Sequence, residues 1–218
     1  MKETMRSSAK PLIALLAASL ALAACHKKTD PKAPTLENFK SGMLAYLKVR
    51  GDLCVGKQFP LDVTDREFQM GSRNAVQMPA LEHAGIVNST ETTGEIQTED
   101  GKVPAKVRRY RLTELGQRSY LAREVPGQVT NTGEKVVRTD LCAVKLSLDK
   151  VTHFELSPQQ QPTSAVVSYT YRVEPAPWTS DPEVQQVFPA VMHVIGGAGS
   201  AELKEAYRRY VSDPDVTR

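Results

Sequence analysis

Three cysteines, Cys25, Cys54 and Cys142, carry the most reactive side chains of the 218-residue chain. A pair of thiols can form a disulfide, act as a redox pair or contribute to a metal site. The usual redox pair needs a Cys-x-x-Cys motif, which the sequence lacks. A tetrahedral metal site needs two further ligands, and no histidine lies near Cys54 or Cys142 in the sequence. We therefore predict a disulfide between Cys54 and Cys142, provided that the protein folds in an oxidising compartment.

These two cysteines lie in similar octapeptides. Residues 50–57 read Arg-Gly-Asp-Leu-Cys-Val-Gly-Lys, and residues 138–145 read Arg-Thr-Asp-Leu-Cys-Ala-Val-Lys. Duplication of a half-domain would explain the match, and so would a local coincidence, which we favour because the downstream stretches do not match. In either case both thiols are expected in extended segments that lie side by side.

The N-terminus is typical of a signal peptide. Basic residues precede an apolar run over residues 11–24 that only Ser19 interrupts. The run is too short to cross a bilayer, but it has the length of the apolar core of a secretion signal. We therefore predict that residues 1–24 direct export and are removed. Export would deliver the cysteine pair to the oxidising periplasm.

The predicted signal ends in Leu22-Ala23-Ala24-Cys25, which resembles the lipobox of bacterial lipoproteins. The resemblance implies acylation of the Cys25 thiol, cleavage before it and acylation of the new amine. More than one acyl chain suffices for stable anchoring. The residue after Cys25 is His26 rather than Asp. In enterobacterial-type lipoproteins this implies release to the outer membrane. The alternative is an ordinary secretory cleavage site followed by an incidental cysteine. The family resemblance implies a location and an anchor, and it implies no activity.

Removal of the signal changes the net charge. The full chain carries +3 at pH 7, of which Lys2, Glu3, Arg6 and Lys10 contribute +2, so about +1 remains on the mature chain. Proteins that bind duplex nucleic acid neutralise many phosphates. Nucleic acid is therefore disfavoured as a partner.

The mature chain is expected to consist of a tether and one domain. Residues 25–34 combine the lipidated Cys25 with a polar, proline-containing tether. Residues 35–218 are expected to form a single periplasmic α+β domain. The domain begins with an amphipathic helix over residues 35–50, in which apolar residues recur every three or four positions.

The central segment predicts a helix over 72–84, a strand from 86, a polar loop over 88–104, a return strand over 107–113 and a helix over 113–121. This order of elements resembles the recognition helix and wing of winged-helix proteins. Two phrases carry the resemblance, Ala80-Leu-Glu-His-Ala-Gly-Ile-Val87 and Arg109-Tyr-Arg-Leu-Thr-Glu-Leu-Gly116. The resemblance implies a topology, and a shared topology does not imply a shared function.

The remainder predicts an antiparallel sheet over 134–175 and a C-terminal helical segment. A helix is expected to start at Asp181-Pro182-Glu183, where an N-cap, a proline and an acid follow one another. Pro189 is expected to shorten or bend this helix. Residues 200–211 fit either a continuing helix or a terminal strand.

No motif in the sequence predicts a catalytic centre. The histidines lack the spacing of metal ligands; they are His26, His83, His153 and His193. No Gly-x-Ser-x-Gly motif accompanies the serines, and the glycines at 196–199 lack a phosphate-loop lysine. We therefore predict no catalytic residue, no metal and no cofactor. A periplasmic enzyme whose site assembles only in space stays open as an alternative.

These patterns together favour a non-catalytic lipoprotein of the outer membrane, anchored through Cys25, that acts through protein contacts or envelope assembly. The expected partner surface comprises Arg108, Arg109, Arg111 and Trp178. For Trp178, packing onto the adjacent sheet is the favoured interpretation, and a place on the partner surface stays open beside it. A winged-helix nucleic-acid binder is the least favoured function, because acidic residues accompany the basic ones in the same loop.

Overall fold

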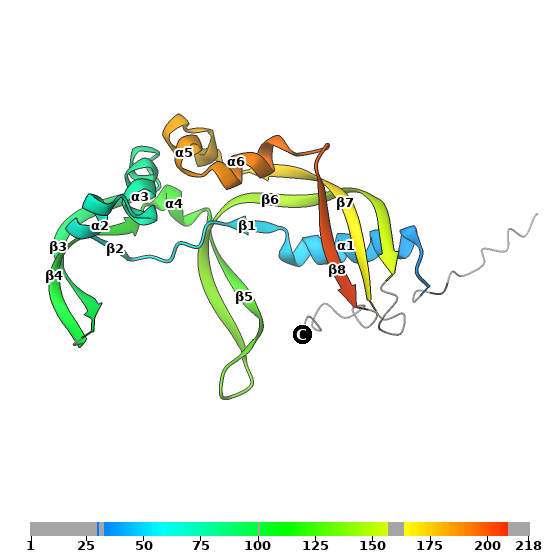
Figure 1. Cartoon of the computed structure of the whole chain (residues 1–218), viewed down its shortest axis with the longest axis horizontal. Coiled ribbons are helices and arrows are strands. Elements are labelled where there is room, and N and C mark those ends of the chain that lie inside the picture. The colour runs from blue at the N-terminus through cyan, green and yellow to red at the C-terminus, as the bar shows by residue number, and fades with distance from the viewer. Residues whose placement is uncertain (1–29, 31–32, 100, 157–163, 209–218) are drawn as a thin grey trace, which may run out of the picture. The chain divides into compact units, whose positions relative to one another are not determined.

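The structure is a computed structural model that describes residues 30, 33–99, 101–156 and 164–208 (Figure 1). Its strands form one sheet of five strands and one sheet of three. All strand pairs among the described residues are antiparallel. The predicted mixture of helices with antiparallel sheets is therefore confirmed.

One strand of 22 residues, β6 (Lys135–Leu156), organises the five-stranded sheet. Its first part pairs with β5 (Tyr120–Val129), and its middle pairs with the short strand β1 (Asp52–Cys54). Its remaining part pairs with β7 (Ser164–Pro175), and β8 (Glu202–Arg208) pairs with the other side of β7. Segments that are distant in the sequence thus meet along a single strand (Figure 1).

Helix α1 (Leu36–Arg50) confirms the amphipathic helix expected at the start of the domain. Thr35 is its N-cap and accepts a hydrogen bond from the backbone N–H of Asn38, as its side chain type favours. Its buried side chains belong to a cluster with residues of β6 and β7, which comprises Met43, Leu47, Leu148, Val167, Tyr169 and Tyr171. The helix therefore covers the part of the sheet formed by those two strands.

Gly51 makes the close approach between α1 and β6 possible. A Cβ atom at this position would collide with the backbone oxygens of Leu47 and Leu146. The Gly51 carbonyl accepts a hydrogen bond of 2.7 Å from the backbone N–H of Leu146. Because the chain turns here without a side chain, β1 can begin one residue after the helix ends.

The three-stranded sheet has the order β2-β4-β3. Strand β2 (Leu61–Thr64) leads into α2 (Asp65–Met70) and α3 (Arg73–His83), and the hairpin of β3 (Val87–Thr98) and β4 (Gly101–Leu112) follows. The predicted helix over 72–84 is confirmed within one residue at each end.

The predicted polar loop over 88–104 is wrong, because residues 88–98 and 101–104 belong to the two strands of the hairpin. The segment contains several threonines, whose branched side chains favour extended backbone. Its polarity reflects exposure of both faces rather than the lack of a strand. Pro104 fits within β4 because it lies beyond the residues that pair with β2, so that β4 has a free edge there.

The helix predicted over 113–121 is mostly wrong. Thr113 caps a single turn, α4 (Glu114–Gln117), and the backbone N–H of Gly116 donates to its hydroxyl. The chain then enters β5 at Tyr120. The cap residue Thr113 predicts where a helix starts and does not predict how long the helix is.

The C-terminal part departs from the predicted helical segment. The expected helix is divided into α5 (Pro182–Val187) and α6 (Pro189–Gly196), because Pro189 starts a second helix. The last described element is the strand β8, which corrects the expected helical ending over its residues. Leu203 and Tyr207 are four residues apart, a spacing that suits a helix face and also one face of a strand.

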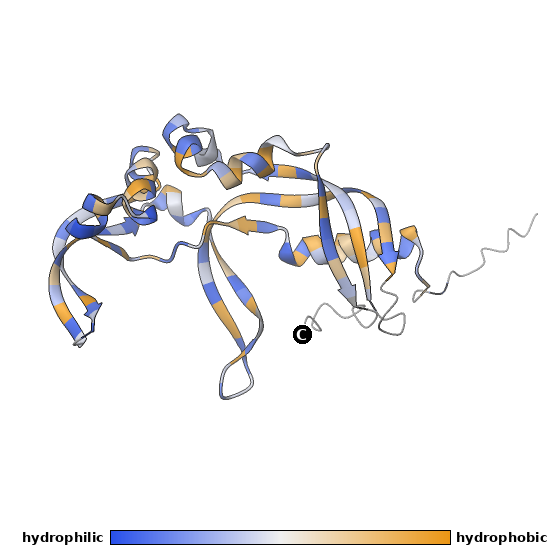
Figure 2. Cartoon of the chain, viewed as in Figure 1, coloured by the Kyte–Doolittle hydropathy of each residue, from blue (hydrophilic) through white to orange (hydrophobic). Residues whose placement is uncertain are grey.

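A second buried cluster joins the three-stranded sheet to α3, α5 and α6, and it includes Met78, Leu81, Tyr110, Leu141 and Trp178. Leu141 belongs to β6, so both sheets contribute to the core. In Figure 2 the hairpin of β3 and β4 is mostly hydrophilic, with only scattered apolar residues. Among the described helices, none has the length and apolarity that a membrane span requires.

Candidate functional site

A disulfide joins Cys54 of β1 to Cys142 of β6, the pairing that the sequence predicts. The two residues face each other in the strand register and are separated by 88 residues in the sequence. The guanidinium of Arg123, on β5, donates a hydrogen bond of 3.0 Å to the sulfur of Cys54. The disulfide joins β1 to β6, and the hydrogen bond from Arg123 adds β5 at the same point of the sheet.

The two similar octapeptides lie antiparallel to each other at this disulfide. Asp52 forms an ion pair of 3.1 Å with Lys145 in the register position opposite. In the reciprocal position, Asp140 accepts a hydrogen bond of 2.7 Å from the backbone N–H of Lys57. Each aspartate of one octapeptide thus contacts the lysine position of the other. Duplication and coincidence both stay open as the origin of the match.

Lys57 is a buried lysine with 3% of its surface exposed. Its ammonium is hydrogen-bonded to the side-chain oxygen of Asn74 on α3. Burial lowers the pKa of Lys57 to about 8, and the positive charge of Arg73 lowers it further, while Asp140 acts in the opposite direction. The side chain fastens the loop after β1 to α3.

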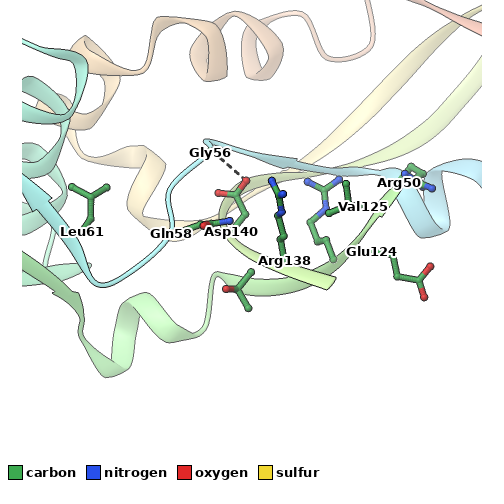
Figure 3. Close-up of a pocket in the computed structure, with 10 residues that line it drawn as sticks. Arg50, Gly56, Gln58, Leu61, Glu124, Val125, Arg138 and Asp140 are labelled. Atoms are coloured by element: carbon green, nitrogen blue, oxygen red, sulfur yellow. Dashed lines mark hydrogen bonds between the residues drawn. The ribbon is translucent and has the colours of Figure 1, made fainter. Parts of the chain in front are cut away.

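Beside the disulfide lies a pocket of about 580 Å³. Three of its lining residues are arginines from three different elements: Arg50 ends α1, Arg123 lies on β5 and Arg138 lies on β6. Its other lining residues include Asp140 and Glu124, and the loop residues Gly56 and Gln58 close one side. Figure 3 shows Arg138 beside Asp140, with Asp140 bonded to the backbone of Gly56.

Arg123 and Arg138 lie directly opposite each other in the pairing of β5 with β6. Side chains in opposite positions lie on the same face of a sheet. The pocket therefore contains two guanidinium groups facing each other across neighbouring strands. Sequence analysis did not identify this site. The arginine at the start of both octapeptides was the available signal, because Arg50 and Arg138 both line the pocket.

The arginines predicted as a partner surface are engaged within the protein instead. Arg109 donates two hydrogen bonds, of 2.7 and 2.6 Å, to the carboxylate of Asp62. This interaction lowers the pKa of the Asp62 carboxyl below its usual value. Arg108 lies 5.2 Å from the centre of the Phe68 ring and 4.0 Å from Glu91.

Strand geometry also divides these arginines between two faces. Side chains alternate along a strand, so Arg109 and Arg111 share one face of β4, while Arg108 shares the other with the buried Tyr110. Arg111 donates a hydrogen bond of 3.5 Å to the hydroxyl of Thr90. The three arginines therefore do not form one continuous basic patch.

The expectation that Trp178 lies on a partner surface is wrong. Trp178 belongs to the 3-10 helix η1 (Pro177–Ser180) and is only 5% exposed. Its ring contacts the edge of Phe188 at a centroid distance of 5.8 Å, inside the cluster of α3, α5 and α6. The proline-bounded position that suggested a surface anchor instead directs the ring into the core, as the favoured interpretation of this residue predicts.

Two further predictions concern metals and the membrane anchor. No group of three or more metal-binding side chains occurs within the described ranges. His83 is near Asp181, at 3.2 Å, and His153 is near Glu155, at 3.8 Å, in separate regions. The signal peptide, Cys25 and His26 lie outside the described residues, as does most of the tether. Their roles stay predictions.

No protein-family model, no curated protein and no solved structure matches this chain.

Proposed function

We propose that this chain is a lipoprotein anchored through Cys25 to the periplasmic face of the outer membrane, where it works by binding rather than by catalysis. The cross-strand disulfide between Cys54 and Cys142 is the observation that carries the proposal. Disulfides persist in oxidising compartments such as the periplasm and are rare in the bacterial cytoplasm. The disulfide thus supports the export that the signal peptide and the lipobox-like sequence predict.

We further propose that β2, α2, α3, β3 and β4 form a winged-helix-like unit. The sheet order β2-β4-β3, with two helices between β2 and β3, supports this interpretation. The contacts of the arginines on β4 argue against duplex binding. A phosphate backbone would have to compete with Asp62 for Arg109 and with Glu91 for Arg108. The unit is therefore proposed as a scaffold.

Metabolic labelling of the full chain with a radioactive fatty acid tests the anchor. The wild-type chain should carry label and fractionate with the outer membrane. The variant Cys25→Ala should lose the label. The matched control is the double variant Cys54→Ser with Cys142→Ser, which keeps Cys25 and should keep the label. An unlabelled wild-type chain, or one recovered from the cytoplasm, would contradict the proposal.

A further inference from the structure

The pairing of Arg123 with Arg138 needs a physical explanation. Arginine side chains stay charged throughout the physiological pH range. Like charges directly opposite each other in antiparallel strands are destabilising. The same ribbon could have placed a carboxylate at either position, as the β3–β4 hairpin does where Glu91 faces Arg108. The two guanidinium groups thus form a positively charged feature that lacks an obvious structural benefit.

The acidic residues of the pocket do not neutralise this pair. Both carboxylate oxygens of Asp140 accept backbone hydrogen bonds, of 3.2 Å from Gly56 and 2.7 Å from Lys57. Glu124 forms an ion pair of 3.1 Å with Lys135. Within the described ranges, no carboxylate lies within ion-pair distance of the Arg138 guanidinium.

Other contacts hold the pair in place. The hydrogen bond to the Cys54 sulfur orients Arg123 from the disulfide. Arg50, at the end of α1, adds a third guanidinium to the lining. The volume of about 580 Å³ lies in the range of small-molecule sites. A ligand larger than a simple ion would therefore find room beside the charged pair.

We propose that this pocket binds a phosphate group between Arg123 and Arg138. Each guanidinium can donate two parallel hydrogen bonds to two oxygens of an oxyanion. A carboxylate has two oxygens, enough for one such fork, whereas a phosphate monoester keeps three unesterified oxygens for two forks to share. The ester substituent can occupy the rest of the pocket. A bound anion also attracts both guanidinium groups and so offsets the repulsion between them.

The phosphate has two possible sources, a free phosphate monoester and the headgroup of a phospholipid. The chemistry at the arginines is the same for both. The inference goes beyond the proposed function and does not depend on the anchor. It concerns residues 50–140 only, so it can fail while the labelling experiment succeeds, and the reverse also holds.

Binding is measured by titration calorimetry on the purified chain with inorganic phosphate and with phenyl phosphate. Vesicles of phosphatidylcholine with and without phosphatidic acid form the lipid arm, and acetate forms the carboxylate arm. Arg138→Gln should weaken phosphate binding by about tenfold or more, because a charge-assisted fork is lost. Arg138→Lys, which keeps the charge without the fork, should weaken it less. The control Arg111→Gln removes an arginine of β4 and should bind as the wild type does.

Thermal unfolding separates ligand binding from a structural role. Without phosphate, Arg138→Gln should unfold at the wild-type temperature or above it, because it relieves a like-charge pair. With phosphate, the wild-type melting temperature should rise and that of the variant should not. A lower melting temperature of Arg138→Gln without ligand would indicate a structural role and contradict the proposal.

The binding outcomes are equally decisive. Binding of phosphatidic acid vesicles alone, of free phosphates alone, or of both supports the phosphate site and identifies the source. Equal binding of acetate and phosphate would overturn the assignment to phosphate. No binding of any phosphate probe by the wild type, unchanged binding by Arg138→Gln, or equal loss in Arg111→Gln would overturn the site.

Discussion

Two long hairpins of this protein carry arginines, and they treat those arginines in opposite ways. In the β3–β4 hairpin, Arg108 faces Glu91 across the strands, and Arg109 holds Asp62 of β2. In the β5–β6 hairpin, Arg123 faces Arg138. The first hairpin has the richer basic sequence, yet its Lys102, Arg108 and Arg109 all contact carboxylates within the protein. The number of basic residues in a segment is therefore a poorer guide to binding than the identity of the residue opposite each one.

The largest expected effect comes from the disulfide, which lies beside only one of the two hairpins. The double variant Cys54→Ser with Cys142→Ser should lower the free energy of unfolding by about 2–4 kcal/mol, because the open chain gains entropy when unfolded. Denaturant unfolding measures the loss. Amide hydrogen exchange should accelerate in β5 and β6 more than in β3 and β4. Equal acceleration in both hairpins would show that the disulfide does not distinguish them.

Lys57 links the pocket to helix α3. Its side chain binds Asn74 of α3, and its neighbours Gly56 and Gln58 line the pocket. The pKa of Lys57 is about 8 in the folded protein against an ordinary value of 10.5. Between these pH values the unfolded chain binds more protons, so the stability of the wild type should rise with pH. The gain is on the order of 3–4 kcal/mol at most, since the pKa falls from 10.5 to about 8 and one pKa unit corresponds to about 1.4 kcal/mol.

The control for this pH dependence is Lys57→Met, which fills similar space without a titrating amine. Unfolding of both proteins is measured at several values from pH 7 to pH 11. The wild type should gain stability relative to Lys57→Met above pH 8. Parallel curves for the two proteins would contradict the lowered pKa.

The smallest expected effects come from exchanging the charge arrangement of the hairpins. Arg138→Glu places a carboxylate opposite Arg123 and should stabilise the protein by about 0.2–1 kcal/mol, while it abolishes phosphate binding. Glu91→Arg places an arginine opposite Arg108 and should destabilise it by a similar amount. Thermal unfolding at low salt measures both changes. Shifts of the same sign in the two variants would refute the role assigned to cross-strand charge.

The sequence predicted the elements whose signals are local. Helix α1 has a threonine cap, apolar residues at helical spacing and a glycine directly after its last residue, and all three signals can be read within one short stretch of sequence. Helix α3 was predicted for similar reasons. Residues 88–104 were predicted as a loop because polar residues on both faces hide a strand that lacks a buried side. That hairpin depends on pairing between strands, which no local pattern encodes.

The candidate pocket escaped prediction for a related reason. Its three arginines are separated by tens of residues, and only the pairing of β5 with β6 brings two of them face to face. The cysteine pair could be predicted because few cysteines are available and the N-terminal sequence predicts export. Arginines are too numerous for such an argument. For Trp178 the neighbouring prolines left a surface position open beside the favoured core position, because its exposure depends on α3, α5 and α6.

The separation of Cys54 from Cys142 along the chain has a consequence for the time course of folding. A chain that is exported from its N-terminus presents the Cys54 thiol before Cys142, which follows 88 residues later. Strand β1 cannot pair until β6 has been synthesised, and helix α1 has no sheet to pack against before then. The Cys54–Cys142 bond can therefore form only late in synthesis, and until then Cys54 lacks its native partner.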